Sequence, residues 1–234
     1  SNFIWKYKKH NIEEINMISK DFSVPKSIAT IMSLKSITNK DESRSFFYHD
    51  LDILHNPLLM LDMEQAIDRI ISAKNNDELI LIIGDYDADG TTAASILYLY
   101  FKSINIDVEY YIPNRQTEGY GVSINSIDYA HKIDAKLIIT CDCGITAIDQ
   151  IEYAKEYNID TIITDHHKQK DDLPKALAIL NPNRHDCTYP FKGLCGAGVA
   201  FKLCIGVNNQ LGNNLNDVLK YTDLVAIATT ADVV

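Results

Sequence analysis

Several features that mark particular classes of protein are absent from this sequence of 234 residues. Its five cysteines are odd in number and form no C-x-x-C pair, which argues against a disulfide framework or zinc ribbon and favours a reducing, cytoplasmic setting. No apolar run approaches the roughly 18 residues of a membrane helix, and no charged-then-apolar leader opens the chain, so we expect no membrane partner. Acidic residues outnumber basic ones by 32 to 22, so the chain lacks the basic footprint of a stand-alone nucleic-acid-binding protein.

The composition that is present is that of a globular protein. Hydrophobic residues make up 46% and charged residues 23%, and the length fits one large domain or two small ones. Residues 1–76 lack strand patterns and are expected to form a helical extension, whose last helix has a cap at Asn56 and its first turn at Pro57. One face of that helix carries apolar side chains at helical spacing, namely Met63, Ala66, Ile67, Ile70 and Ile71.

Residues 77–234 have a different pattern, in which short apolar runs alternate with stretches of helical periodicity. Strands are expected at 79–83, 108–112, 136–140, 161–164 and 178–180. Helices are expected at 91–103, 123–131, 146–157, 198–211 and 215–229. Apolar strands separated by helices are typical of parallel sheets with right-handed crossovers. The predicted fold class is therefore α/β, a parallel β-sheet flanked by helices and preceded by an N-terminal helical segment.

Acidic and imidazole groups follow three of the predicted strands. The first strand runs into Asp85, Asp87 and Asp89, the third into Asp142, and the fourth into Asp165-His166-His167. Ligands of open parallel sheets bind beyond the carboxyl ends of the strands, where these groups would meet. Carboxylates gathered in this way repel one another unless a cation lies among them, and imidazole shifts the preference toward Mn²⁺. The sequence thus predicts a divalent metal site, with two ions favoured.

Simpler interpretations exist for each of these segments. A single Asp after a strand is as readily a helix cap, but capping does not account for three aspartates within five residues. The D-x-D-x-D-G pattern resembles an EF-hand loop, yet Ile96 stands where the bidentate Glu belongs. Cys141 and Cys143 are more consistent with packing than with soft-metal binding. The recurrence of these groups at successive strand ends favours the functional interpretation.

Four motifs in this order resemble those of the DHH phosphoesterase superfamily. They are Asp85-Tyr-Asp-Ala-Asp-Gly90, the segment around Asp142, Asp165-His-His167 and Ala231-Asp232. Further stretches resemble its RecJ-type branch of single-strand-specific exonucleases. These are Pro113-Asn-Arg115 with Glu118-Gly-Tyr-Gly121, Asn181-Pro-Asn-Arg184, and Leu194-Cys-Gly-Ala-Gly-Val-Ala-Phe201. The resemblance extends from about Pro57 to the end of the chain.

The resemblance implies a set of metal ligands and a catalytic group. One or two Mn²⁺ or Mg²⁺ ions would be bound by Asp85, Asp87, Asp142, His166 and Asp232. Asp142 would bridge the ions when both are bound. His167 would face the scissile phosphate, Asp165 would orient the imidazoles, and Asp89 would lie close to the reacting groups.

Substrate contacts are expected from two loops. Arg115 is the candidate for gripping a phosphate, because a guanidinium binds phosphate through two hydrogen bonds; the alternative is a surface ion pair with Glu118. Gly196 and Gly198, together with Gly193, precede a helix and could offer backbone N–H groups to a phosphate. Close packing of that helix explains these glycines equally well.

The function implied by the resemblance is metal-dependent hydrolysis of single-stranded DNA from its 5′ end, in DNA repair and recombination. The chain stops in apolar sequence at Val234, so we expect one domain of a longer protein, without the second α/β domain and the oligonucleotide-binding barrel of RecJ-type enzymes. This chain alone would bind single-stranded DNA weakly, and single-strand-binding and repair proteins are possible partners of the intact protein.

Other functions stay open. One is a DHH phosphodiesterase acting on short oligoribonucleotides or cyclic dinucleotides, and another is a non-catalytic RecJ-like scaffold. A manganese pyrophosphatase is disfavoured because Leu81 occupies the position of its additional His. A Rossmann dinucleotide-binding protein is disfavoured because carboxylates follow the first strand where a pyrophosphate needs glycines and amide donors.

Overall fold

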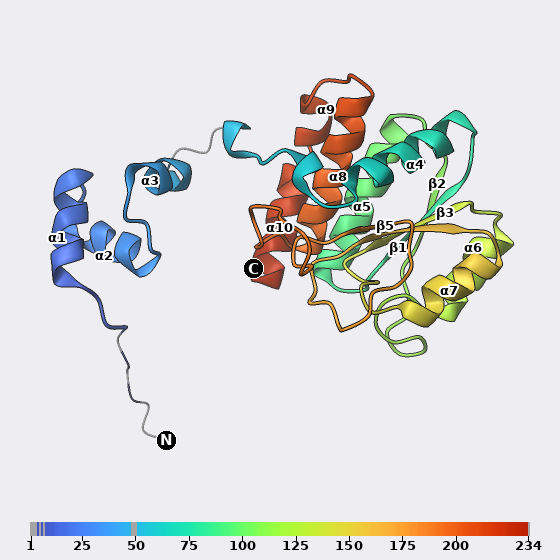
Figure 1. Ribbon diagram of the computed structural model, residues 1–234, viewed down its shortest axis with the longest axis horizontal. Coiled ribbons are helices and arrows are strands. Elements are labelled where there is room, and N and C mark those ends of the chain that lie inside the picture. The colour runs from blue at the N-terminus through green and yellow to red at the C-terminus, as the bar shows by residue number, and fades with distance from the viewer. Residues whose placement is uncertain (1–3, 5, 7, 48–50, 234) are drawn as a thin grey trace. The chain divides into compact units, whose positions relative to one another are not determined.

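The computed structural model describes residues 4, 6, 8–47 and 51–233, and the chain divides into two compact units, Ser1–Leu54 and His55–Val234 (Figure 1). The first unit is helical in its described part, as expected. Its elements are α1 (Ile12–Asp21), α2 (Lys26–Leu34), α3 (Lys40–Phe47) and the short 3₁₀ helix η1 (Leu51–Ile53). A small apolar core holds α1 and α2 together and consists of Ile15, Ile18, Ala29, Met32 and Ile37.

The second unit is built on a five-stranded, wholly parallel sheet with the strand order β2-β1-β3-β4-β5. The strands are β1 (Ile80–Gly84), β2 (Val108–Tyr111), β3 (Leu137–Cys141), β4 (Asp160–Thr164) and β5 (Ala178–Leu180). The central strands β1 and β3 are buried along their whole length, as their apolar sequences require. All five strands were expected from the sequence, including the short β5.

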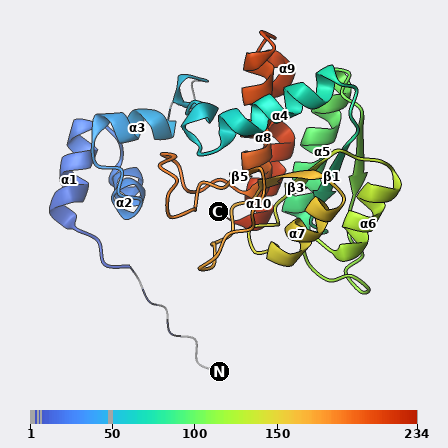
Figure 2. The same ribbon diagram turned by 45° about the vertical axis from the view of Figure 1, so that its right-hand side comes forward.

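Helices cover both faces of this sheet, so the unit has three layers (Figures 1 and 2). They are α4 (Met63–Asn75), α5 (Ala88–Ser103), α6 (Ile124–Lys132), α7 (Ile148–Glu156), α8 (Gly196–Gln210), α9 (Asn216–Leu219) and α10 (Thr222–Asp232), with the 3₁₀ helix η2 at Pro57–Leu59. Ile80 and Ile82 of β1 pack with α4, α5 and α8 in one core. Leu81 and Ile83 point to the other face and pack with α6 and α7.

Helix α4 belongs to the second unit, whereas the sequence places it in an N-terminal extension ending at residue 76. Its apolar face, with Met63 and Ile67, is part of the core that contains α8, and the chain divides after Leu54. Asn56 does cap a helical turn, since its side chain accepts a hydrogen bond from the Leu58 amide. That turn is η2, however, and α4 begins only at Met63.

The last part of the chain also differs from expectation in one respect. The stretch predicted as a single helix over 215–229 forms α9 and α10, separated at Lys220 and Tyr221. All five cysteines lie in the described part, where they are buried and unpaired. Within the described residues, no helix is both long enough and apolar enough to span a membrane.

Candidate metal centre at the carboxyl edge of the sheet

Three aspartates follow neighbouring strands at the same level of the sheet. Gly84 of β1 pairs with Cys141 of β3, and Cys141 pairs with Thr164 of β4. The backbone ladder continues for one more residue, because the amides of Asp85, Asp142 and Asp165 donate to carbonyls of the next strand along the sheet. Parallel pairing therefore places the three carboxylates side by side at the carboxyl edge, as the sequence predicts.

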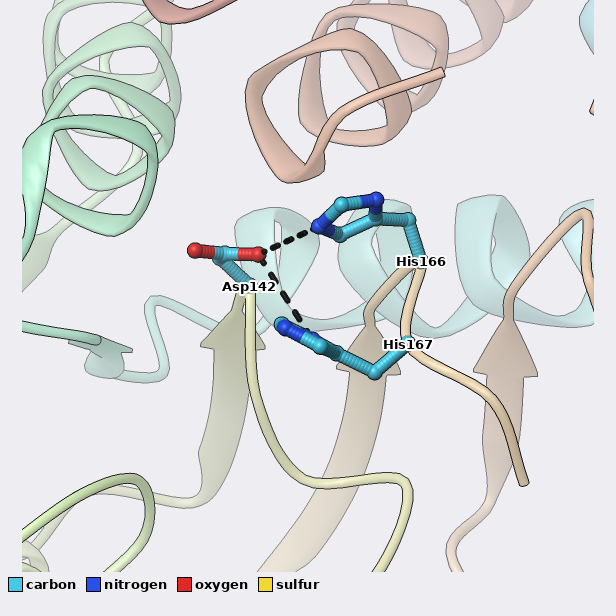
Figure 3. A group of neighbouring side chains, drawn as sticks. All are labelled: Asp142, His166 and His167. Atoms are coloured by element: carbon cyan, nitrogen blue, oxygen red, sulfur yellow. Dashed lines mark ion pairs between the residues drawn. The ribbon is translucent and has the colours of Figure 1, made fainter. Parts of the chain in front are cut away.

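Asp142 lies at the centre of this group. Its backbone adopts a left-handed conformation with φ of 59°, and its side chain is buried. Asp142 Oδ1 lies 3.2 Å from His166 Nε2 and 3.8 Å from His167 Nδ1, so both imidazoles point at one carboxylate (Figure 3). Oδ1 is thus shared by two rings that follow β4.

His166 is surrounded by carboxylates from three elements. Besides Asp142, its Nε2 lies 3.7 Å from Asp89 Oδ2 and 3.6 Å from Asp232 Oδ2. Asp232 comes from the last turn of α10, which packs against α5 and α8. The fourth motif therefore reaches the edge of the sheet from a helix, and the structure brings it to the others as the sequence predicts.

The three aspartates of the first motif have different surroundings. Asp85 is buried, and its Oδ1 accepts from the Gly121 amide at 3.3 Å. Asp87 is exposed and caps α5 through the Gly90 amide at 2.9 Å. Asp89 is buried and accepts hydrogen bonds from the first amides of α8. Helix capping thus explains part of the motif, as the simpler interpretation expects, while it leaves Asp85 unexplained.

The electrostatics of the site reflect buried charges of one sign. Burial raises the pKa of Asp85 and of Asp142, although hydrogen bonding and charge from His166 counteract the shift at Asp142. Burial lowers the pKa of His166, but Asp142 outweighs it and raises that pKa overall. The hydrogen bond to Asp165 raises the pKa of His167 to about 9. A cation among these carboxylates would relieve their mutual repulsion.

The donor atoms fit a divalent cation. Three buried atoms of the site make no aligned hydrogen bond within the described residues, namely Asp85 Oδ2, Asp142 Oδ1 and His166 Nε2. Such orphaned atoms are costly unless a partner satisfies them. Ligand atoms within 4.8 Å of one another form three groups, Asp85-Asp87-Asp142, Asp89-His166-Asp232 and Asp142-His166-His167. Carboxylate oxygens with imidazole nitrogens suit Mn²⁺ or Mg²⁺.

Residues 79–229 match the family model described as the DHH family, N-terminal domain. The chain belongs to the DHH family. Among curated relatives, it is 35% identical over 234 residues to the single-stranded-DNA-specific exonuclease RecJ of Bacillus subtilis, covering all of this chain and 29% of the relative. It is 38% identical over 182 residues to RecJ of Escherichia coli, covering 74% of this chain and 32% of the relative. The chain therefore spans about 30% of the length of these relatives.

Two crystal structures of RecJ resemble this DHH-family chain. One is exonuclease RecJ bound to manganese, with a TM-score of 0.69 and 33% identity, covering 74% of this chain and 44% of that one. The other is RecJ of Thermus thermophilus in complex with Mn²⁺, with a TM-score of 0.76 and 26% identity, covering 95% of this chain and 31% of that one. The predicted fold class is confirmed.

The name-giving triplet of the DHH family is organised by Asp165. Its Oδ1 accepts from the backbone amides of His166 and His167 at 2.7 and 3.0 Å and lies 2.8 Å from His167 Nδ1. Its Oδ2 accepts from the Ile145 amide at 2.9 Å. Although burial opposes it, this bonding lowers the pKa of Asp165, so the carboxylate stays charged. Asp165 thus contacts the His167 ring and both histidine amides, while its role in orienting the imidazoles stays a prediction.

Two tyrosines beside the DHH-family site were not singled out from the sequence. The Tyr120 hydroxyl donates to the Asp142 carbonyl at 3.2 Å and lies 3.2 Å from His167 Nε2. Tyr86 packs edge-to-face on Tyr120, and the Arg115 guanidinium lies over the Tyr86 ring, 5.3 Å from its centroid. The sequence did contain a signal, because Tyr86 adjoins Asp85 and Tyr120 lies in the Glu118–Gly121 stretch.

Arg115 and Glu118 do not pair, in contrast to the alternative considered for Arg115. Within the described part of the chain, Arg115 forms no ion pair with Glu118. The Glu118 carboxylate instead accepts from the Tyr111 and Ser123 hydroxyls and from the Asn114 amide. Arg115 is exposed, so its guanidinium is available to a phosphate.

The amino-terminal end of α8 does not offer its first amides to a phosphate. Asp89 Oδ2 accepts from the Gly196 amide at 2.6 Å and Asp89 Oδ1 from the Ala197 amide at 2.8 Å. The packing explanation holds for Gly196, since an added Cβ would come 2.5 Å from Asp142 Cβ. A Cβ on Gly198 would come 3.1 Å from Leu194 Cδ2, so this position is also tightly packed. Asp89 is therefore a cap of α8 that also borders the metal centre.

Proposed function

We propose that this chain is the metal-dependent phosphodiesterase core of a RecJ-like exonuclease that degrades single-stranded DNA from its 5′ end in DNA repair and recombination. The observation that carries the proposal is the convergence of three buried atoms without an aligned hydrogen bond, Asp85 Oδ2, Asp142 Oδ1 and His166 Nε2, beside the His167 ring. The RecJ relatives, which are single-stranded-DNA-specific exonucleases by name, support the choice of substrate. Asp85, Asp87, Asp142, His166 and Asp232 would hold one or two Mn²⁺ or Mg²⁺ ions, with Asp89 beside them.

Hydrolysis of a phosphodiester needs an activated water and compensation of the phosphate charge, and bound divalent ions supply both. The protein supplies a proton at the leaving oxygen. Asp165 accepts from Nδ1 of His167, and the raised pKa of that imidazole keeps it protonated at neutral pH. Nε2, at the other end of the ring, lies 3.2 Å from the Tyr120 hydroxyl, and its proton is the one proposed for transfer. His167 is thus the proposed general acid.

The surroundings of the site suit a single strand with unstacked bases. Tyr120 is 55% exposed beside the catalytic imidazole, and Tyr86 with Arg115 extends this surface outward. Aromatic rings bind bases by stacking, and a guanidinium binds the backbone phosphate. The formal net charge of −10 opposes binding of a polyanion, so this chain alone should bind single-stranded DNA weakly. Regions corresponding to the remaining length of its relatives would supply the attraction and the contacts to single-strand-binding and repair proteins.

The free cysteines are consistent with a reducing cytoplasm, where we place the protein. We regard the segment from residue 77 onward as the DHH domain, with α4 packed on it, and the preceding helices as an N-terminal extension.

The test is release of nucleotides from 5′-labelled single-stranded DNA in Mn²⁺, with 3′-labelled DNA as the comparison for polarity. Asp142→Asn removes the central ligand and should abolish release, whereas Asp149→Asn, at an exposed position of α7, should leave it unchanged. Duplex DNA, short RNA and a cyclic dinucleotide run in parallel. Cleavage of only the RNA or the cyclic dinucleotide would move the assignment to the other DHH phosphodiesterases. Bound Mn²⁺ without any cleavage would mean either that the core needs the remaining length of its relatives to engage DNA or that it is a scaffold, and absence of Mn²⁺ binding would reject the metal centre.

A further inference from the structure

The turn Asn181-Pro-Asn-Arg184 lies beside the two histidines of the site. It follows β5, which pairs in parallel with β4, so the two loops leave the sheet side by side. The Asp165 amide donates to the Leu180 carbonyl at 3.0 Å, which fixes the loops to each other at their start. Beyond this bond the backbone hydrogen bonds of the sheet end, and the two loops are joined by hydrogen bonds from side chains.

Two amide side chains of this turn bond the backbone of the histidine pair. Asn183 Nδ2 donates to the His166 carbonyl at 2.6 Å, and Asn181 Nδ2 donates to the His167 carbonyl at 2.8 Å. Asn181 Oδ1 accepts from the Asn183 amide at 2.7 Å, so the orientation of the Asn181 amide is determined. An aspartate at either position could not donate and would place a carboxylate against a carbonyl.

Asp165 completes this arrangement from the opposite side of the backbone. Its Oδ1 accepts from both histidine amides, at 2.7 and 3.0 Å. All four backbone polar groups of His166 and His167 are therefore held by side chains rather than by a strand or helix. The direction of both rings toward Asp142 depends on these side chains, because the rings extend from that backbone (Figure 3).

The turn itself is fixed to the framework by a buried arginine. Arg184 is 8% exposed, and its Nη1 donates to the Ile179 carbonyl at 2.9 Å and to Asp62 Oδ2 at 2.6 Å. Asp62 Oδ2 also accepts from the Ile179 amide at 3.1 Å, and Asp62 directly precedes α4. Asp186 binds the remaining edge of the guanidinium at 2.8–3.0 Å. This anchoring makes the turn a rigid support for the two asparagines.

We infer that Asn181 and Asn183 are positioning residues that set the placement of His166 and His167 for metal binding. The inference rests on the proposed function to the extent that the site binds a divalent ion. Groups that orient metal ligands from behind commonly change metal affinity about 10- to 100-fold when they are removed. Asn183→Ala should therefore weaken Mn²⁺ binding by about this factor without unfolding the chain, since Asn183 is only half-buried.

The experiment is a titration of the 234-residue chain with Mn²⁺, in which unbound Mn²⁺ is followed by electron paramagnetic resonance. The variants are Asn183→Ala, the isosteric Asn183→Asp, and Asn181→Ala. The control is Asn209→Ala, on the exposed surface at the far end of α8. Circular dichroism without metal gives the Tm of each variant, and the titration is done at a temperature at which every variant is folded. A substitution that affects only stability would then lower Tm but leave the Mn²⁺ affinity of the folded protein unchanged.

The expected result is a Kd for Mn²⁺ raised about 10- to 100-fold in the Asn183 and Asn181 variants and unchanged in Asn209→Ala. Should Asn183→Ala fail to fold, Asn183→Asp keeps the size of the side chain and carries the same test. Folded variants that bind Mn²⁺ as tightly as the unmodified chain would overturn the inference and leave the proposed function standing. An unmodified chain that binds no Mn²⁺ would overturn both.

Discussion

Gly196 lies so close to Asp142 that a β-carbon at position 196 would come 2.5 Å from Asp142 Cβ and 2.7 Å from Asp142 Oδ1. The first residue of α8 thereby sets how far the central carboxylate can move. Any larger side chain must displace Asp142 or push the helix away from the sheet. The glycine is needed for this contact and not for an unusual backbone conformation.

Gly196→Ala should therefore weaken Mn²⁺ binding by about tenfold or more and destabilise the fold by about 1–3 kcal/mol, the usual cost of overpacking. Gly198→Ala is the matched control on the same helix. The nearest neighbours of its added Cβ would be Leu194 and Cys195 rather than Asp142, so it tests tight packing without the contact to the carboxylate. Mn²⁺ titration and urea unfolding measure the two effects. Equal Mn²⁺ affinities in the two variants would show that the contact with Asp142 is unimportant.

Substitution of Asp89 should lower the free energy of unfolding more than substitution of Asp87. Asp89→Ala leaves two buried amides of α8 without their acceptor, which should cost about 2–3 kcal/mol in metal-free buffer. Asp87→Ala removes one exposed cap of α5 and should cost about 1 kcal/mol. Urea unfolding in the presence of a chelator provides the comparison. A smaller loss for Asp89→Ala than for Asp87→Ala would contradict the capping role of Asp89.

The partnership of Asp165 and His167 should be visible in a pH titration of the metal-free protein. A histidine whose pKa rises to about 9 on folding adds stability that is complete below about pH 6.5 and is lost as the pH rises through 9. Asp165→Asn should return the His167 pKa toward its ordinary value. The stability difference between the two proteins should then be larger at about pH 6 than at about pH 10. Nuclear magnetic resonance of the imidazole protons measures the pKa directly, and an unchanged pKa would exclude Asp165 as its cause.

Lys202 should make the protein less stable at neutral pH. This α8 side chain is 5% exposed, its Nζ donates to the His55 carbonyl at 2.8 Å, and burial lowers its pKa to about 8. The unfolded chain, with an ordinary lysine pKa of about 10.4, binds more protons between these values, so stability rises with pH from about 8 to 10.4. Lys202→Met should stabilise the fold by about 1–3 kcal/mol at pH 7.

This gain should shrink as the pH approaches about 10.4, where the lysine is increasingly neutral in both states. Thermal unfolding of both proteins across this pH range measures the gain in stability. Lys132→Met, at an exposed position of α6, serves as the control and should show little change at any pH. A gain that does not vary with pH would point to packing rather than to the buried charge.

The strands and the three aspartates that follow them were predictable because each depends on local sequence. An apolar run such as Leu79–Ile83 specifies a buried strand, and parallel pairing then brings Asp85, Asp142 and Asp165 to one edge. The position of the His166-His167 pair at this edge was predictable for the same reason. Asp232 was predictable only through the family motif, because it approaches from a helix that the sequence alone does not place beside the sheet.

Other features depend on contacts between distant segments and leave no local pattern. Asp89 caps a helix that begins more than a hundred positions later, so its sequence neighbourhood shows only a further acidic residue. Gly196 appears in the sequence as one of several glycines before a helix, and only packing identifies Asp142 as its neighbour. The break between α9 and α10 at Lys220 and Tyr221 was missed because the apolar periodicity continues through it.

The wholly parallel sheet has a consequence for how the protein reaches its native state. In the strand order β2-β1-β3-β4-β5, each pair of neighbouring strands is joined by a connection that contains at least one other segment. The site in turn needs residues from Asp85 to Asp232. Chains dominated by such non-local pairings fold slowly, because the entropy of loop closure is lost before the contacts form. The complete ligand set includes Asp232 of α10 as well as the residues that follow the strands, so an ion that uses all of it binds only a chain in which the sheet and α10 have both formed.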